Sequence, residues 1–290
     1  DQQTSSFIIE WSEMRTFFNN SIETFQLILY DTGWQTPTGD DEMKIQFKEF
    51  NNNSVGDYPV GNYDGAVVHG QYCTVGIENH LCDDGLQYTY NNSYHESAMT
   101  LYDETALFIT TRTDLSVAEP SLELSADELY FELQDNQEST AQLIVSNEGE
   151  ENSILFYSAK ISPFATDINN VDNYGYAWTE SLSNLDIDYN WINIEDDNQI
   201  VVLPDNDSGG IVNMNFQFPF YGNQYNFCAV MANGWIGFEA TEQSWNNQSI
   251  FDEESPKGAI LAFWDDLYPE SLVNDDGSGN IRYHSNSDRL

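Results

Sequence analysis

Positively charged residues are scarce in this sequence. Its 290 residues include 8 Lys and Arg against 49 Asp and Glu, which gives a formal net charge of −41 at pH 7. A surface this negative repels phosphate backbones and anionic lipid headgroups, so we expect neither a nucleic-acid partner nor membrane insertion. It suits cations, basic ligands or a salty medium, because the Debye length falls to roughly 4–5 Å at the ionic strength of seawater. The charge therefore predicts an extracellular protein from a marine or high-salt setting, or one loaded with calcium.

Cysteine is also scarce, and long apolar runs are missing. Three cysteines are too few for the framework of a disulfide-rich domain. Cys73 and Cys82 lie nine residues apart in "CTVGIENHLC", a spacing that permits a local disulfide; part-buried thiols are the equally weighted alternative. No stretch approaches the ~18 apolar residues that a membrane helix needs.

Helical periodicity is almost absent, and strand patterns run through most of the chain. The stretch "MKIQFKEF" (43–50) alternates apolar and polar side chains with the period of two that is typical of a half-buried strand. Similar stretches, separated by Gly, Asn and Asp, are "TFQLILYDTG", "QYCTVGIEN", "GLQYTYNN" and "TALFITTRT". With 17 Tyr, 17 Phe and 7 Trp, the chain can fill a sizeable core. These features predict an all-β fold.

The composition divides the chain into three parts. Residues 1–113 are rich in strand patterns and aromatic residues. From Asp114 onward, shorter strand patterns and the turn "NEGEEN" predict a small immunoglobulin-like β domain and a linker over residues 114–170. Aromatic-rich strand patterns return in residues 171–290.

Residues 171–290 contain the stretches "YGYAWTES", "FQFPFYGNQYNFCAVMANGWIGF" and "ILAFWDDL". Through these stretches they resemble the first half of the large, nidogen-like β-sandwich modules of secreted bacterial surface proteins and protease-associated domains. Residues 1–113 resemble the second half, through "FIIEW", "TFQLILYDTG", "IQFKEF" and "TVGIENHLCDDGLQYTYN". The order of the halves is therefore permuted. The resemblance implies a large β-sandwich built from two half-domains, with the small immunoglobulin-like domain between them.

Both ends of the chain carry strand patterns. Phe7, Ile9 and Trp11 alternate at one end, and Ile281 and Tyr283 alternate at the other. Either half alone would expose strand edges and an apolar face. The halves either close on each other within one chain, or the end of one chain completes the start of the next. We favour the second arrangement, which makes the protein its own partner in a head-to-tail filament or tandem array.

Residues that could carry chemistry form no catalytic or zinc pattern. The stretch "DSGG" (207–210) lacks the flanking residues of a serine-protease loop, and the four histidines show no metal-binding spacing. Adjacent strand residues point to opposite faces, so Asp265 and Asp266 make a poor acid–base pair. Calcium is the more plausible ligand, because it prefers oxygen-rich loops. The candidate calcium ligands are Asp265, Asp266, Asn274, Asp275, Asp276 and Asn280.

Taken together, these features predict a non-enzymatic extracellular structural or adhesive protein. The alternative is an accessory or ligand-binding module of a secreted bacterial hydrolase, with carbohydrate or protein as its ligand. Cell-surface glycans are a further expected partner. An enzyme ranks last, because the sequence shows neither a nucleophile beside a base nor a metal-binding cluster.

Overall fold

The structure is a computed structural model, and it describes most of the chain. The described residues are 5–16, 21–31, 36–53, 72–95, 97–112, 122–126, 140–148, 171–181, 187–194, 199–201, 203, 209–239, 245–250, 252, 255–269 and 279–286. They contain seventeen β-strands and no α-helix, so the predicted all-β fold is confirmed. Within these ranges, no helix is long and apolar enough to cross a membrane.

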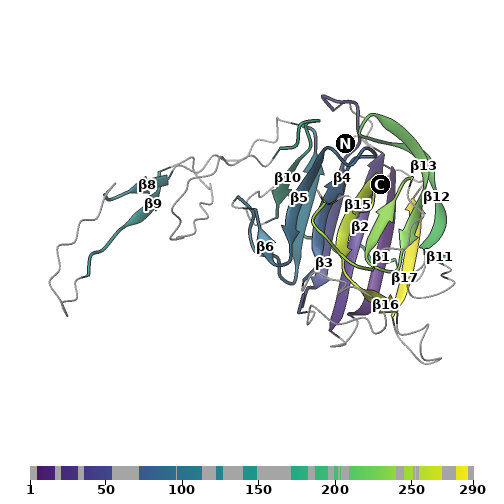
Figure 1. Ribbon diagram of the computed structural model, residues 1–290, viewed down its shortest axis with the longest axis horizontal. Coiled ribbons are helices and arrows are strands. Elements are labelled where there is room, and N and C mark those ends of the chain that lie inside the picture. Colours follow the sequence, from purple (N-terminus) through teal and green to yellow (C-terminus); the bar gives the residue numbers. More distant parts are fainter. Residues whose placement is uncertain are drawn as a thin grey trace, which may run out of the picture.

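An eight-stranded antiparallel sheet, sheet A, forms one layer of a sandwich (Figure 1). Its order is β10–β7–β3–β2–β1–β17–β11, with β16 also paired to β1. The bounds are β1 Ser5–Thr16, β2 Ile22–Asp31, β3 Met43–Glu49, β7 Thr105–Thr110, β10 Ala177–Glu180, β11 Gln199–Ile200, β16 Leu267–Pro269 and β17 Asn280–Asn286. Four strands come from each end of the chain.

A seven-stranded antiparallel sheet, sheet B, forms the other layer. Its order is β12–β13–β14–β15–β4–β5–β6. The bounds are β4 Thr74–Glu78, β5 Gly85–Tyr90, β6 Ser93–Tyr94, β12 Gly209–Phe220, β13 Asn223–Met231, β14 Trp235–Gly237 and β15 Ala259–Trp264. The pair of β15 and β4 joins strands from the two ends of the chain. Both sheets are therefore completed only when both ends are present.

The two ends of the chain meet in sheet A. β1 and β17 are antiparallel neighbours over seven residue pairs, from Ser6 opposite Asn286 to Ser12 opposite Asn280. The side chains expected to mediate assembly lie in the core, where Phe7, Ile9, Trp11 and Ile281 are buried and Tyr283 is partly buried. In this structure the halves thus close on each other within one chain, whereas the strand patterns at the two ends favoured head-to-tail assembly between chains.

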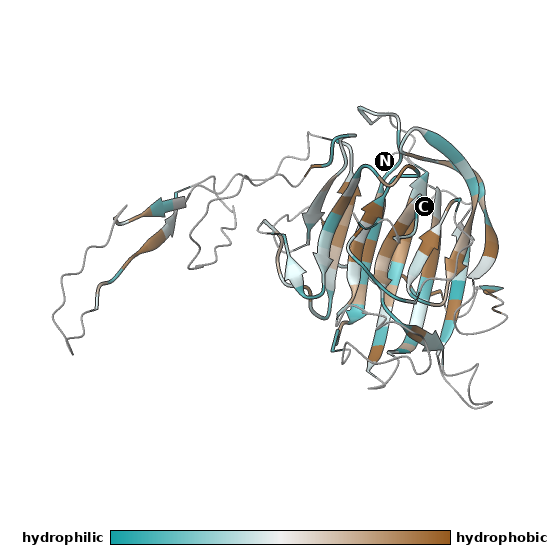
Figure 2. Cartoon of the chain, in the orientation of Figure 1, coloured by the Kyte–Doolittle hydropathy of each residue, from teal (hydrophilic) through white to brown (hydrophobic). Residues whose placement is uncertain are grey.

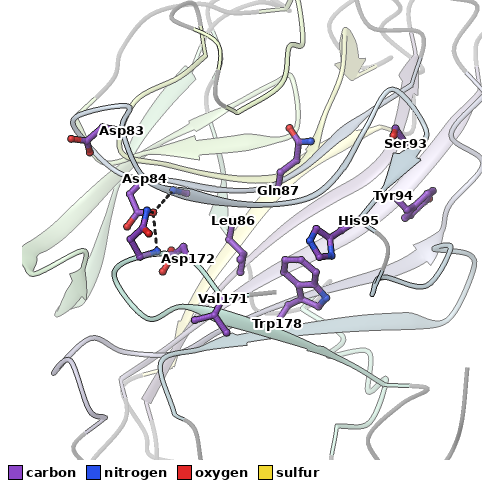
Figure 3. Close-up of a pocket in the computed structure, with 12 residues that line it drawn as sticks. Asp83, Asp84, Leu86, Gln87, Ser93, Tyr94, His95, Val171, Asp172 and Trp178 are labelled. Atoms are coloured by element: carbon purple, nitrogen blue, oxygen red, sulfur yellow. Dashed lines mark hydrogen bonds between the residues drawn. The ribbon is translucent and has the colours of Figure 1, made fainter. Parts of the chain in front are cut away.

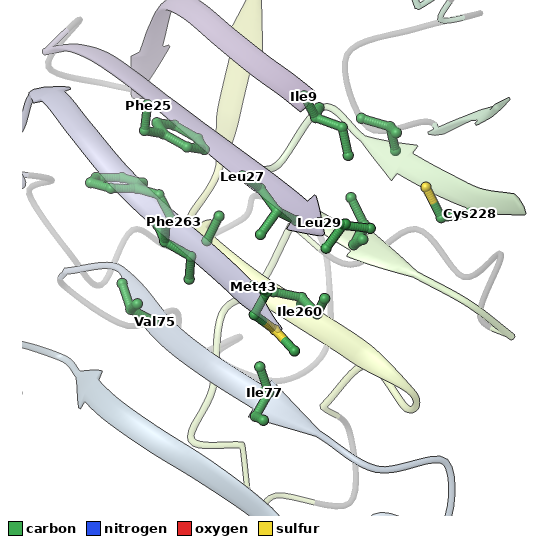
Figure 4. Close-up of a cluster of buried hydrophobic side chains, with 14 of the residues drawn as sticks. Ile9, Phe25, Leu27, Leu29, Met43, Val75, Ile77, Cys228, Ile260 and Phe263 are labelled. Atoms are coloured by element: carbon green, nitrogen blue, oxygen red, sulfur yellow. The ribbon is translucent and has the colours of Figure 1, made fainter. Parts of the chain in front are cut away.

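Apolar side chains from both sheets fill the space between the layers. Alternate residues of β2, such as Phe25 and Leu27, face residues of sheet B that include Val75, Ile260 and Phe263 (Figure 4). Figure 2 shows apolar residues gathered on the strands of the sandwich. The indole N–H of Trp11 also crosses the core and donates to the carbonyl of Met231, at 2.9 Å. The core thus ties β1 to β13.

The outer face of sheet A carries a buried polar row. The Gln26 amide donates to Glu10 at 2.7 Å, and the Gln46 amide donates to Gln26 at 2.9 Å. Arg282 on β17 donates to Glu10 at 3.3 Å, which extends the row across four strands. The carbonyl of Ile192, in the covering segment 187–194, also accepts from Gln26. Each partner satisfies a polar group that would otherwise be costly to bury.

The segment between the halves is described only in part. β8 (Leu122–Leu124) and β9 (Val145–Asn147) form a two-stranded antiparallel sheet. Most of residues 114–170, and with them the predicted immunoglobulin-like domain, lie outside the described residues.

Candidate functional site

A pocket of about 420 Å³ lies where the edges of the two sheets approach each other (Figure 3). One wall is the turn between β4 and β5, together with β5 and β6 themselves. The other wall is the short segment 171–173 and Trp178 on β10. The pocket is therefore built by segments from both half-domains.

The acidic end of the pocket is fixed by turns. Asp84 accepts the backbone N–H of Gly85 and both the backbone and side-chain N–H groups of Asn173, each at 3.1 Å. Asp172 accepts the N–H groups of Gly175 and Tyr176, at 2.7 and 2.8 Å. These bonds hold the two carboxylates in place without any cationic side chain.

Asp172 is also tied to the opposite sheet. The hydroxyl of Tyr221 donates to its second oxygen at 2.6 Å. Partial burial raises the pKa of Asp172, and the Tyr221 bond and the backbone N–H groups oppose this shift. Burial and the Asp172 charge both raise the pKa of Tyr221, so its hydroxyl keeps its proton. This pair links the rim of the pocket to the β12–β13 turn.

Rings line the other end of the pocket. The His95 imidazole stands edge-on to Trp178, with centroids 5.2 Å apart, and Tyr94 lies beside them in the lining. Trp178 packs edge-on against Tyr88 as well, at 5.4 Å. In Figure 3 these rings lie away from the carboxylates, with Leu86 and Val171 between. The site thus has an acidic end and an aromatic end.

Charge restricts what this pocket can bind. Its twelve lining residues include three carboxylates, from Asp83, Asp84 and Asp172, and no Lys or Arg. The whole chain adds a strongly negative field, which concentrates cations near the surface. An anionic ligand is disfavoured on both grounds. A cation whose stem is apolar matches both ends, because its charge meets carboxylates and its stem meets rings.

The predicted calcium ligands are only partly described. Asn274, Asp275 and Asp276 lie outside the described residues. Asp265 and Asp266 are buried, and desolvation raises the pKa of Asp265 well above its usual value, which weakens it as a cation ligand. No group of three His, Cys, Asp or Glu in the described ranges is placed to hold a metal.

Asn280 lies apart from the acidic pair. It sits opposite Ser12 on β1, whereas Leu267, directly after Asp266, sits opposite Thr16. Four residues of strand separate these positions, a distance of about 13 Å. The structure does not bring Asn280 together with Asp266, and calcium binding stays a prediction.

The disulfide considered between Cys73 and Cys82 is not formed, and both residues are free thiols. Cys73 directly precedes β4, and Cys82 lies in the turn that follows it. An extended five-residue strand spans about 16 Å, far beyond the reach of a disulfide. The Cys82 thiol instead donates to Glu78, and burial together with that carboxyl raises its pKa to about 12. A protonated thiol is a weak nucleophile.

Two motifs behind the resemblance pack against each other. Asn233 of "NGW" is fully buried, and its side-chain oxygen accepts the N–H of Leu267 in "WDDL" at 2.9 Å. Gly234 has a φ of +79°, and a Cβ there would lie 2.0 Å from the carbonyl oxygen of Phe263. The motif residues thus lock the β13–β14 turn onto the end of β15. Residues 185–286 match the family described as NIDO related.

This region is therefore similar to nidogen-related domains. It covers β11 to β17, and it agrees with the resemblance of residues 171–290. A nidogen-related domain is an extracellular type of module. No curated protein and no solved structure matches this chain.

None of the site residues expected from the sequence lines the pocket. The residues that do line it stand inside or beside the motifs that carried the resemblance, "GIENHLCDDGLQY" and "YGYAW". Placing the two half-domain motifs side by side would have brought Asp84 and Trp178 to one region. The pattern of acidic loops with glycine instead points to residues 265–280.

Proposed function

We propose that this chain is a non-enzymatic structural or adhesive module of an extracellular protein. It holds a partner protein by a Lys or Arg side chain placed in the pocket between β5, β6 and β10. The observation that supports this proposal is that the lining combines three carboxylates with a wall of rings and contains no Lys or Arg. A long basic side chain fits this arrangement, because its stem packs on apolar surface while its charge meets the carboxylates.

The working form that we propose is the closed chain. Head-to-tail assembly through β1 would require β17 of another chain to take the place beside it. That place is held by the chain's own β17 over seven residue pairs, and exchange would first have to break them. A ligand-binding pocket also agrees with the alternative function, an accessory module of a secreted hydrolase, because such a module would need a ligand site.

Calorimetry with short peptides tests the proposal. We expect a Gly-Lys-Gly peptide with blocked ends to bind, and the same peptide with acetylated lysine to lose binding. Affinity should fall as salt is raised, because the contact is ionic. If both peptides bind equally, or if neutral sugars bind and the lysine peptide does not, the proposed ligand is wrong and the carbohydrate alternative gains.

A matched pair of variants places the binding in this pocket. Asp83 is exposed and accepts the side-chain N–H of Asn79, a bond that Asp83→Asn retains. Removing its charge should lower the affinity for the lysine peptide about fivefold, which is the effect expected from the loss of one partly exposed ion pair. Glu123→Gln, an equally large charge change at an exposed position of β8, should leave the affinity unchanged.

A further inference from the structure

We propose that two copies of this chain associate through the outer edge of β12, antiparallel to each other about a twofold axis near Ile211. The proposal is independent of the pocket, which lies at the other edge of sheet B. It rests on the length of this edge, its lack of charge and the side chains that it exposes.

β12 is an unusually long strand for its position. Among the described strands it pairs only with β13, so it ends sheet B. It contains 12 residues, of which the five from Gly209 to Asn213 form a regular ladder, whereas the other strands that end the two sheets, β6, β10 and β11, contain 2, 4 and 2. Folded proteins commonly shorten or charge their edge strands, because free N–H and C=O groups invite another strand. The other three edge strands follow this pattern, because each of them is short.

The same part of the chain is free of charge. Residues 208–238 contain no Asp, Glu, Lys or Arg over 31 positions, although 20% of the whole chain is charged, which would place about six there. Two copies that each carry −41 repel each other wherever acidic surfaces meet. The β12–β13 hairpin is a surface on which they can touch with little repulsion. That argument favours a second copy over a basic partner, which would prefer the acidic faces.

The outward side chains of the hairpin are apolar or carboxamide. Ile211 is 68% exposed and Phe227 is 43% exposed, although both lie in regular strands. Beside them, a hollow of about 460 Å³ is lined by Asn213, Asn215, Phe216, Gln217 and Asn226. A carboxamide both donates and accepts, so such side chains can pair with their own copies across a twofold axis.

The position of the twofold axis follows from the regular part of the strand. The ladder with β13 is regular from Gly209 to Asn213 and shifts before Phe218. Within the shifted part, Asn215 has a φ of +65°, and the hydroxyl of Ser285 donates to the carbonyl of Met214. The edge is therefore interrupted beyond Asn213. The regular segment is centred on Ile211, which places Ile211 beside its counterpart.

The resulting contact is small. Two five-residue strands and their flanking side chains lie at the low end of specific interfaces, so we expect a weak, reversible dimer. Salt should strengthen it, because screening reduces the repulsion between the two acidic bodies. The lysine-binding pocket has the opposite salt dependence, so failure of one proposal is distinguishable from failure of the other.

Sedimentation velocity tests the proposal on the whole chain at 0.1 M and 1 M NaCl over a range of concentrations. We expect monomer and dimer in exchange, with more dimer at high salt. Ile211→Lys should abolish the dimer, since it places a charge on the twofold axis. Ile200→Lys is the matched control, because Ile200 is 57% exposed on β11 and the substitution adds the same charge. Unchanged circular dichroism and melting temperature would establish that both variants fold.

A second variant reports the geometry directly. Ile211→Cys should form a disulfide-linked dimer under mild oxidation, because directly opposed strand residues place their Cβ atoms about 5 Å apart. The proposal is wrong if the wild type stays monomeric at high salt and high concentration. Equal loss of dimer in both lysine variants would also overturn it. So would open polymers in place of dimers, since a twofold contact closes on itself.

Discussion

Glu78 is a buried carboxyl whose protonation should control stability. It is 1% exposed, and it accepts hydrogen bonds from the hydroxyl of Ser255 at 2.6 Å and the thiol of Cys82 at 2.7 Å. Burial raises its pKa from 4.5 to about 7, and these two hydrogen bonds oppose the shift. We predict that Glu78→Gln stabilises the protein at pH 8 and changes little at pH 4.5. The amide keeps the shape, and both neighbours can adapt as donor or acceptor.

The size and sign of the effect follow from proton linkage. A group whose pKa is raised in the folded state binds its proton more tightly there than in the unfolded chain. Its stabilising contribution is complete below pH 4.5 and is lost as the pH rises through 7. A pKa difference from 4.5 to about 7 corresponds to roughly 3 kcal/mol. In a chain of this size, that corresponds to a melting temperature higher by about 6 °C.

Calorimetric melting of both proteins from pH 4.5 to pH 8.5 measures this difference. The gap in melting temperature should open between pH 4.5 and pH 7 and then stay constant. Glu123→Gln is the control, because it removes one negative charge from an exposed position and should show no such gap. If the gap between Glu78→Gln and wild type is the same at pH 4.5 and pH 8, the reasoning from burial is refuted.

Three further predictions follow from the core and the acidic loops. Trp11→Phe removes the hydrogen bond to the Met231 carbonyl and leaves a void in the core. It should lower the free energy of unfolding, measured in urea, by about 2–4 kcal/mol. A change below about 0.5 kcal/mol would contradict the role of Trp11 between the sheets. Gly234→Ala should reduce the folded fraction sharply, because it strains a positive φ and meets the Phe263 carbonyl, and an unaltered melting temperature would count against that contact. If the acidic loops bind calcium, a chelator should lower the melting temperature by several degrees through ligand linkage, and identical melting curves would argue against calcium.

The strands themselves were predictable from periodicity. The alternation in "MKIQFKEF" identified β3, and its inward residues Met43, Ile45 and Phe47 are all fully buried. Local patterns of this kind fix which face of a strand is apolar. They do not fix its neighbours. β1 and β17 were recognisable as strands, but whether they pair within one chain or between chains depends on tertiary register, which no local pattern contains.

The pocket was hidden for a related reason. Asp84 and Asn173 touch, although they lie 89 positions apart in the sequence. Each reads locally as part of an ordinary polar turn, and only the packing of sheet edges gives them a common site. Glu78 and Cys82 show the same limit at short range, because their spacing suggests nothing until the turn after β4 folds the thiol back onto the carboxyl.

The polar row across sheet A has a consequence for biosynthesis. Glu10 bonds to Arg282, 272 positions later in the chain. At ordinary ribosomal speeds of roughly 5–20 residues per second, β1 waits roughly 15–55 s before its neighbour β17 exists. Throughout that interval an apolar strand lacks one of its partners, a state that favours aggregation. The abundant carboxylates that repel finished molecules from one another should do the same for unfinished ones, so we expect the acidity of this chain to reduce aggregation while it is being made.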